Sequence, residues 1–171
     1  MPDPIKLNSA AGRVTFNPSK DWSLSSSYGF IDTPEALDPG VSEHRLTASA
    51  MFNKALGDNN LAVALLFGRN IRLGTHQDAY NLEATYSTPL WSLYGRWENV
   101  AKDELTGVPP GTYNINKILI GATRNLAVRD GVEYGVGGYI GLYSFPTSLD
   151  PFYGKSPVSL GVYFRIRPGK M

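Results

Sequence analysis

Eight charged side chains stand at alternate positions of segments in which apolar residues recur at every second position. If these charges share one wall of a polar passage, they bias which solutes cross it, as rings of charge do in channels. If they pair across neighbouring strands, they instead fill a narrow interior as a buried ion network. The eight residues are Arg13, Arg45, Glu83, Arg96, Glu98, Glu133, Arg165 and Arg167.

Catalytic chemistry finds little support in the same residues. Glu83 and Glu98 could act as an acid–base pair, but Arg96 lies two positions from Glu98 on the same strand face and favours a salt bridge. The two histidines, His44 and His76, are isolated, and the acidic residues lack calcium-loop spacing. We therefore expect no enzymatic activity, no metal site and no cofactor.

Ser42 and Glu43 directly precede His44, so the three residue types of a serine–histidine–acid site stand side by side in the sequence. Neighbours in sequence rarely form a triad, since a triad is assembled in space from separate segments. A second short pattern, Gly135-Val136-Gly137-Gly138, lies inside a predicted strand rather than at the start of a helix. It predicts wall curvature and close packing against Tyr139 and Tyr143, not a nucleotide-binding loop.

The elements that position these residues are predicted to be strands. Apolar residues alternate with polar ones almost throughout, and most segments run 9–14 residues, which exceeds the usual strand length of about 5–6 residues. The nine segments are Ser9–Asn17, Trp22–Ile31, His44–Asn53, Leu61–Asn70, Ala79–Ser87, Ser92–Lys102, Ile115–Ala127, Val132–Phe145 and Pro157–Arg167.

Short and long connections alternate between these segments, with Ile71–Asp78 intermediate in length. This alternation predicts successive antiparallel hairpins in one domain over residues 1–171, with the tight turns at one end. Two Leu-Asp-Pro patterns, which begin at Leu37 and Leu149, predict turns in two of the long loops or a shared lid over them.

Sorting each segment by parity separates two faces. In seven segments one face carries no Lys, Arg, Asp or Glu, and every charge lies on the opposite face among small and hydroxyl residues. The segment Leu61–Phe67 is apolar on both faces. Lys117 and Arg124 have opposite parity within one segment, which indicates either a β-bulge between them or a misplaced segment boundary.

Three features indicate that the apolar face points outward into lipid. Only 18% of the residues are charged, against about 25% in typical soluble domains. A set of inward-pointing Trp, Tyr and Phe would overfill a small barrel. Aromatic residues gather at both strand ends, like the interfacial belts of transmembrane barrels. The belt residues are Phe16, Trp22, Tyr28, Phe30, Phe52, Tyr80, Tyr86, Trp91, Trp97, Tyr134 and Phe164.

The sequence therefore predicts an all-β fold, a transmembrane antiparallel up-and-down meander β-barrel of about 8–10 strands. The longest apolar run, Leu61–Phe67, is too short for a membrane helix, which needs about 18 residues. The chain has no cysteine, which excludes disulfides and thiol catalysis. Its net charge of +1 argues against a nucleic-acid partner.

Several stretches resemble bacterial outer-membrane β-barrel proteins of the porin type, and more narrowly the C-terminal half of larger, mostly uncharacterised barrels of Gram-negative bacteria. The resemblance covers most of the chain and implies the fold and the outer membrane rather than a defined solute. The stretches are Ser27–Gly29, Pro34–Pro39 with His44–Ser49, Phe67–Asn70, Glu98–Leu105, Leu149–Gly154 and Arg165–Met171.

Two departures from that family pattern concern the ends of the sheet. Such barrels commonly end in an aromatic residue, whereas the last residue here is Met171. Nine strands is an odd number, whereas bacterial single-chain barrels have even numbers. Either Met1–Asn8 holds a further piece of strand, or one segment is misassigned, or the chain is part of a larger barrel.

We expect a porin-like barrel for passive passage of small polar solutes, or a structural barrel, with the lipid bilayer and either further copies or an envelope complex as partners. One alternative is a non-conducting barrel whose long loops bind a protein or surface, as an adhesin or envelope-complex subunit does. Another is a soluble lipocalin-like ligand binder. At nine or ten strands the charges are expected to plug the interior, and assembly into a larger ring would reverse that expectation.

Overall fold

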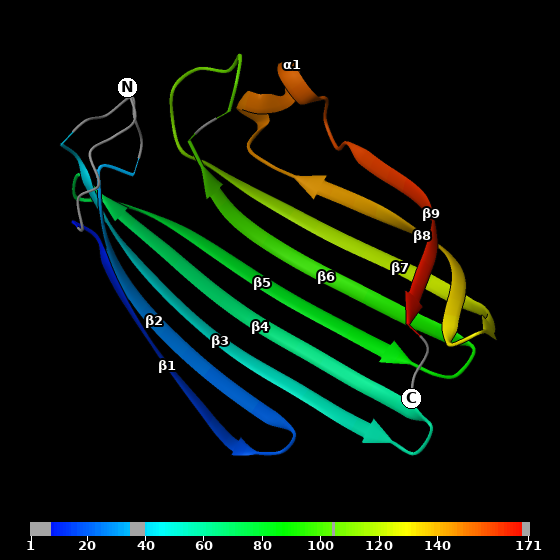
Figure 1. Ribbon diagram of the computed structural model, residues 1–171. Helices are drawn as coiled ribbons and strands as arrows, with labels where there is room; N and C mark the ends of the chain where they lie inside the picture. The colour runs from blue at the N-terminus through cyan, green and yellow to red at the C-terminus, as the bar shows by residue number, and fades with distance from the viewer. Residues whose placement is uncertain (1–7, 35–39, 104, 169–171) are drawn as a thin grey trace.

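The computed structural model describes residues 8–34, 40–103 and 105–168, and 75% of the described residues lie in strands. The strands form one sheet in which each strand is antiparallel to its neighbours in the chain (Figure 1). The strands are β1 Ala10–Ser19, β2 Trp22–Asp32, β3 Ser42–Leu56, β4 Asn59–Arg72, β5 Thr75–Ser87, β6 Trp91–Lys102, β7 Tyr113–Arg129, β8 Val132–Ser144 and β9 Val158–Pro168.

The predicted all-β meander of nine antiparallel strands is confirmed. The sheet is open, however: its order runs from β1 to β9, and these two strands form its free edges. Residues 1–7, considered above as a further piece of strand, lie outside the described residues. Closure into a barrel is therefore not a property of the described sheet.

Tight turns join β1 to β2, β3 to β4, β5 to β6 and β7 to β8 at one end, and long loops follow β2, β6 and β8 at the other. The intermediate connection predicted over Ile71–Asp78 is wrong, and with it the strict alternation of short and long connections. Leu73 and Gly74 alone join β4 to β5, with φ values of 50° and 75°. Two successive positive φ values are those of a type I′ hairpin turn, which lets both strands continue to its edge.

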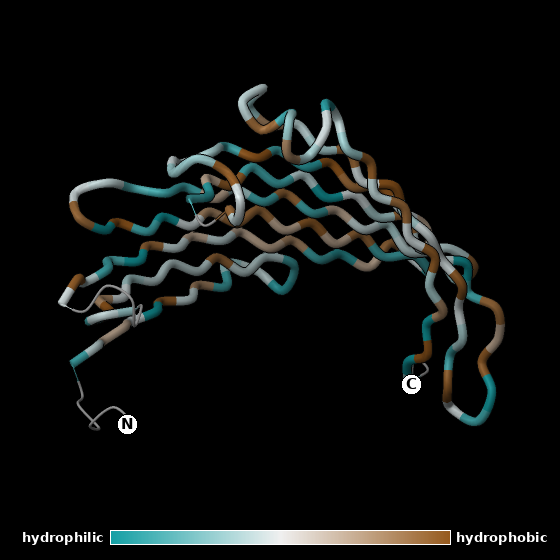
Figure 2. Tube along the Cα trace, turned by 90° about the horizontal axis from the view of Figure 1, so that it is seen from above, coloured by the Kyte–Doolittle hydropathy of each residue, from teal (hydrophilic) through white to brown (hydrophobic). Residues whose placement is uncertain are grey.

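The sheet is strongly curved, and its two faces differ in chemistry (Figure 2). We call the outer side the convex face and the hollow inner side the concave face. Large apolar side chains are exposed along the convex face, with Leu160 76% and Val162 87% exposed. Among the described residues the only buried hydrophobic side chain is that of Leu149, in the loop after β8. The sheet thus has no apolar core of its own.

The β-bulge predicted between Lys117 and Arg124 is not found there. Residues 117–124 alternate without interruption, which places Lys117 on the concave face and Arg124 on the convex face. The β7–β8 register shifts only after both charges, between Asn125 and Ala127, so that Leu126 is the extra residue.

One short helical segment interrupts the strands. The 3₁₀-helix η1 spans Thr147–Leu149 and the helix α1 spans Asp150–Tyr153, both in the loop between β8 and β9. The turn predicted at Leu149 is thus a short helix, and the matching pattern at Leu37 lies outside the described residues. In the described part of the chain, no helix has the length and apolarity needed to cross a membrane.

Candidate functional site

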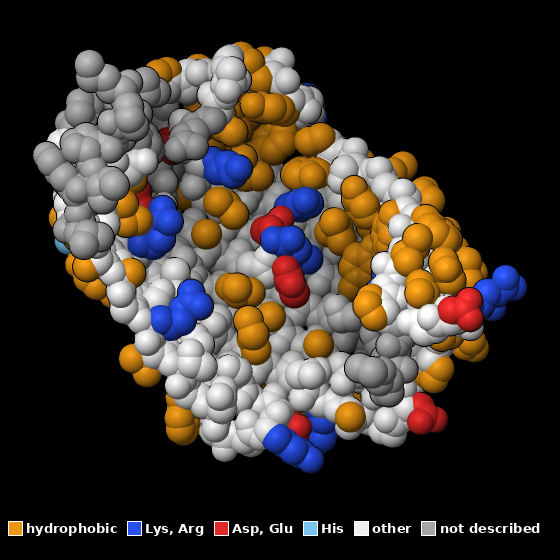
Figure 3. Space-filling view, in the orientation of Figure 1, with side chains coloured by type: hydrophobic (Ala, Val, Ile, Leu, Met, Phe, Trp, Pro, Cys, Tyr) orange, Lys and Arg blue, Asp and Glu red, His pale blue; other side chains and the backbone are white. Residues whose placement is uncertain are grey.

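All eight charged residues singled out from the sequence lie on the concave face. The strand register places them at alternate positions, level with small and polar side chains of the neighbouring strands. Figure 3 shows this face hollowed, with positive and negative side chains gathered near its centre. A cavity of about 700 Å³ occupies the hollow, and Arg13, Glu83, Arg96 and Glu98 are among its lining residues.

The central charges form one network across β5, β6 and β7. The Arg96 guanidinium contacts Glu83 Oε1 at 3.2 Å and Glu98 Oε1 at 2.5 Å. Lys117 Nζ lies 3.9 Å from Glu98 Oε2. The Glu83–Arg96 pair is directly opposed in the register, as are Glu98 and Lys117. The expected salt bridge is present, and it engages both candidate carboxylates of an acid–base pair.

A second network lies at the tight-turn end beside the free edge of β9. Arg165 Nη2 donates to Glu133 Oε1 at 2.8 Å, and Arg167 Nη2 lies 2.7 Å from the same oxygen. Arg165 also donates to Asn125 Oδ1 at 2.7 Å. The side chain of Glu133 is only 8% exposed. Its two arginines therefore offset the cost of removing a carboxylate from water.

The remaining two predicted charges lie toward the other free edge. Arg45 on β3 pairs with Glu43 at 2.7 Å and donates to Asn70 Oδ1 at 3.0 Å. Arg13 on the edge strand β1 forms no ion pair with any residue that the structure describes. Arg13 is therefore a positive charge free to act on a solute in the hollow.

Positive charge exceeds negative charge on the concave face. By register and lining, the described strands place eight basic and four acidic residues there. The basic residues are Arg13, Arg45, Arg72, Arg96, Lys102, Lys117, Arg165 and Arg167. The acidic residues are Glu43, Glu83, Glu98 and Glu133. Such an excess attracts anions into the hollow.

Tyrosine rings pack over glycines on the same face. Tyr94 lies against Gly121, its partner on β7, and Tyr139 lies against Gly161, its partner on β9. The Tyr163 hydroxyl lies 3.0 Å from that of Tyr94 and 2.5 Å from Thr123 Oγ1. The predicted packing of the glycines at 135–138 against Tyr139 and Tyr143 is wrong, because Tyr139 lies against Gly161 and the ring over Gly137 is that of Tyr163.

All eleven predicted belt aromatics lie on the convex face by register. Neighbours within each belt contact one another across strands: Trp22 and Phe52 have ring centroids 5.0 Å apart at the tight-turn end. At the loop end, Tyr80 contacts Phe67, a convex-face aromatic outside the predicted set, at a centroid distance of 5.2 Å. The two belts flank a band of small and aliphatic side chains.

Charges on the convex face lie near the strand ends. Arg69 donates two hydrogen bonds to Asp78, at 2.6 and 2.7 Å, three residues from the β4–β5 turn. Arg124 lies over the ring of Trp91, the first residue of β6, at 5.1 Å from its centroid. These charges are therefore level with the aromatic belts rather than with the aliphatic band.

Ser42, Glu43 and His44 do not converge on a catalytic arrangement. Glu43 pairs with Arg45 on the concave face, whereas His44 Nδ1 lies 2.6 Å from the Tyr28 hydroxyl on the convex face. Within the described ranges no group of three or more His, Cys, Asp or Glu residues could hold a metal ion.

Comparison of the chain with family models, with curated proteins and with solved structures found no match.

Proposed function

We propose that the chain forms part of the wall of an outer-membrane β-barrel that lets small polar solutes, preferentially anions, pass by diffusion. The single observation that carries this proposal is the distribution of side chains on one curved sheet. The convex face exposes apolar residues between two aromatic belts, and the concave face carries a hollow lined by charges.

Lipid is the solvent that suits the convex face. In water, an apolar surface that covers a whole sheet favours aggregation, whereas soluble monomers rarely expose patches larger than a few hundred Å². A strand that crosses a bilayer at a tilt needs about 9–11 residues. The shortest described strands have 10 and 11 residues, which is sufficient. Long loops at only one end are also typical of outer-membrane barrels.

The openness of the sheet supports an aqueous interior rather than a plugged one. In a closed barrel of eight strands, side chains just fill the interior. Open aqueous channels belong to barrels of about 16 strands. Nine strands that leave an open hollow fit the curvature of a wider barrel. In a wider barrel the paired charges line the wall without blocking it.

Closure in this account requires an odd number of additional strands. β1 and β9 run in the same direction, because they are the first and the last of nine strands, each antiparallel to the next. Direct pairing of these edges would be parallel, and so would pairing with a second copy in the same orientation. An inverted copy would place long loops on both sides of the membrane. An odd number of additional strands, which the described sheet does not contain, would keep every pair of neighbouring strands antiparallel.

Planar-bilayer conductance tests the proposal on the assembled barrel, purified in detergent from the membranes in which it is made. We expect conductance steps whose reversal potential in a KCl gradient indicates a preference for chloride. Arg13→Glu should shift the reversal potential toward that of potassium, because Arg13 lies in the hollow without an ion partner. Lys20→Glu, in the β1–β2 turn, serves as the control and should shift it less.

Two results would favour the other functions. The first is a protein that shows no conductance, binds a protein or a surface, and loses that binding when residues 147–155 are deleted. Such a protein would be an adhesin or an envelope-complex subunit. A chain that stays monodisperse without detergent would be a soluble binder, and that result alone would overturn the membrane assignment.

A further inference from the structure

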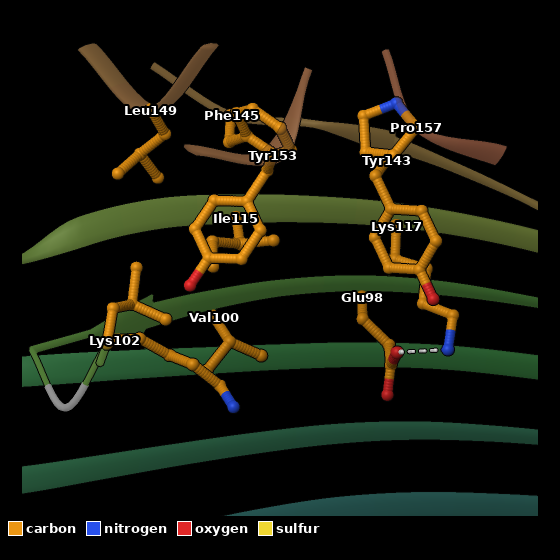
Figure 4. A pocket seen from close by; sticks show the side chains of 11 residues that line it. Glu98, Val100, Lys102, Ile115, Lys117, Tyr143, Phe145, Leu149, Tyr153 and Pro157 are labelled. Atoms are coloured by element: carbon orange, nitrogen blue, oxygen red, sulfur yellow. Dashed lines mark ion pairs between the residues drawn. The ribbon is translucent and has the colours of Figure 1, made fainter. Parts of the chain in front are cut away.

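The loop between β8 and β9 covers part of the concave face and encloses a pocket of about 560 Å³, which we call the loop pocket (Figure 4). Its floor comes from β6, β7 and β8, and its cover from the loop. Ligand pockets commonly measure 300–1,000 Å³, so a small molecule fits. Most lining side chains are apolar, including Val100, Ile115 and Leu149.

The sequence of the loop fixes its cover in place. Pro151 lies in the first turn of α1, and Gly154, at a φ of 79°, ends the helix. Leu149 points from this turn toward the pocket and is only 1% exposed. The Tyr143 amide donates to the Pro157 carbonyl oxygen at 3.3 Å, which holds the end of the loop against β8. The pocket is therefore formed by an anchored loop.

Two ammonium groups give the loop pocket a positive charge. Lys102 forms no ion pair with any residue in the described part of the chain. Lys117 lies 5.4 Å from the centroid of the Tyr143 ring and 3.9 Å from Glu98. The Glu98 carboxylate is already engaged by Arg96 at 2.5 Å. An anion that enters thus meets one unpaired cation and a second that is only weakly paired.

We propose that the loop pocket binds a small monocarboxylate with a compact apolar body. The carboxylate would pair with Lys102, the unpaired ammonium group, and the body would contact the aliphatic and aromatic walls. Phe145 and Tyr153 offer an edge-to-face pair of rings with centroids 6.1 Å apart, which suits an aromatic body. A fully polar anion leaves these walls unfilled, and a neutral apolar molecule leaves the Lys102 ammonium group unpaired.

This inference extends the proposed function, since it names a class of solute on the path through the hollow. Binding and conductance are nevertheless separate measurements. Binding without conductance would retain the site and overturn the passage, and conductance without binding would do the reverse.

The test is ¹⁹F NMR titration of the purified protein in detergent with 4-fluorophenylacetate. We expect saturable binding that 2-(4-fluorophenyl)ethanol, which has the same ring but no charge, does not match. Lys102→Gln should weaken the binding of the carboxylate by about tenfold, because it removes a charge-assisted contact. Lys20→Gln, at the opposite end of the strands, is the matched control and should leave the binding unchanged.

Two outcomes would overturn the inference. One is equal binding of the carboxylate and the alcohol, which would mean that partition into detergent or apolar contact alone accounts for the signal. The other is equal affinity of the two lysine variants. The Lys102 side chain is exposed, so its replacement should leave the fold intact. The far-UV circular dichroism spectra of Lys102→Gln and Lys20→Gln should therefore both match that of the unchanged protein.

Discussion

The concave face is held together by tyrosine rings that cover glycines. Tyr163 on β9 lies over Gly137 on β8, and its hydroxyl reaches Thr123 on β7. A Cβ added at Gly137 would lie 2.7 Å from the carbonyl oxygen of Ala122 and 2.5 Å from the Tyr163 ring. The glycine thus permits a contact that joins three strands, and the backbone on its other side cannot easily move.

Gly137→Ala should lower the free energy of unfolding by about 1–3 kcal/mol, because overpacking forces the ring and the backbone apart. Gly68→Ala is the matched control, since an added Cβ there meets no atom within 4 Å. Denaturation in urea, followed by circular dichroism in detergent, measures both. Equal stability of the two variants would show that the ring over Gly137 contributes nothing.

At the residue scale the sequence predicted which side chains share the charged face, but not which of them form a site. Parity identifies the face of Arg96 or Glu133 because side chains alternate along a strand. Lys102 and Lys117 carry no signal of a pocket, since the loop pocket depends on where residues 145–157 fold in space. Leu149 likewise shows nothing in the sequence that predicts its 1% exposure, because its burial depends on the fold of the whole loop.

At the scale of the strands, each element presents one side to the convex face and the other to the concave face. Leu65 on β4 faces outward, opposite Ala50 and Leu82, and is 52% exposed. The next residue, Leu66, lines the hollow. The two leucines have the same chemistry and adjacent positions, so they compare the two environments directly.

Leu65→Lys should reduce the free energy of folding into lipid vesicles by about 2–4 kcal/mol, which is the cost of a lysine near the bilayer midplane of a barrel wall. Leu66→Lys should cost less, because its ammonium group remains in an aqueous hollow. Tryptophan fluorescence during a denaturant titration in vesicles gives both values. A larger loss for Leu66→Lys than for Leu65→Lys would contradict the assignment of faces.

The strands themselves were predictable, because a polar and an apolar face impose a period of two over long segments. The place of the β7 bulge was not predictable, because Lys117 and Arg124 lie on opposite faces of a regular strand and the register shift follows both. The β4–β5 turn was not predictable either, because Arg72 and Thr75 look like loop residues by type. They extend the strands because Leu73 and Gly74 adopt the two positive φ values of a type I′ turn.

At the scale of the whole molecule, the open sheet decides what its charges can do. Strand number could be read from the sequence, whereas the openness of the sheet could not, because parity fixes the two faces of each strand but not the twist between neighbouring strands. A nine-stranded barrel closed on itself would need a parallel seam between β1 and β9. The open sheet instead leaves both edges for further strands.

Disulfide formation tests the seam, and the absence of native cysteines keeps the test free of background. Val14→Cys with Ser26→Cys should form an intramolecular disulfide, since these residues are directly paired on β1 and β2. Val14→Cys combined in turn with Leu160→Cys, Val162→Cys or Phe164→Cys should form none. A disulfide in any of these three variants would show that β1 and β9 meet within one chain.

The central claim is that the convex face contacts lipid while the concave face contacts water. Ala50 and Ser49 are adjacent small residues of β3, with Ala50 on the convex face and Ser49 in the hollow. Each is replaced singly by cysteine, labelled with bimane and placed in lipid vesicles. We predict that spin-labelled lipid quenches bimane at position 50, and that aqueous iodide quenches it at position 49. Iodide quenching at both positions, or the reverse pattern, would contradict the account.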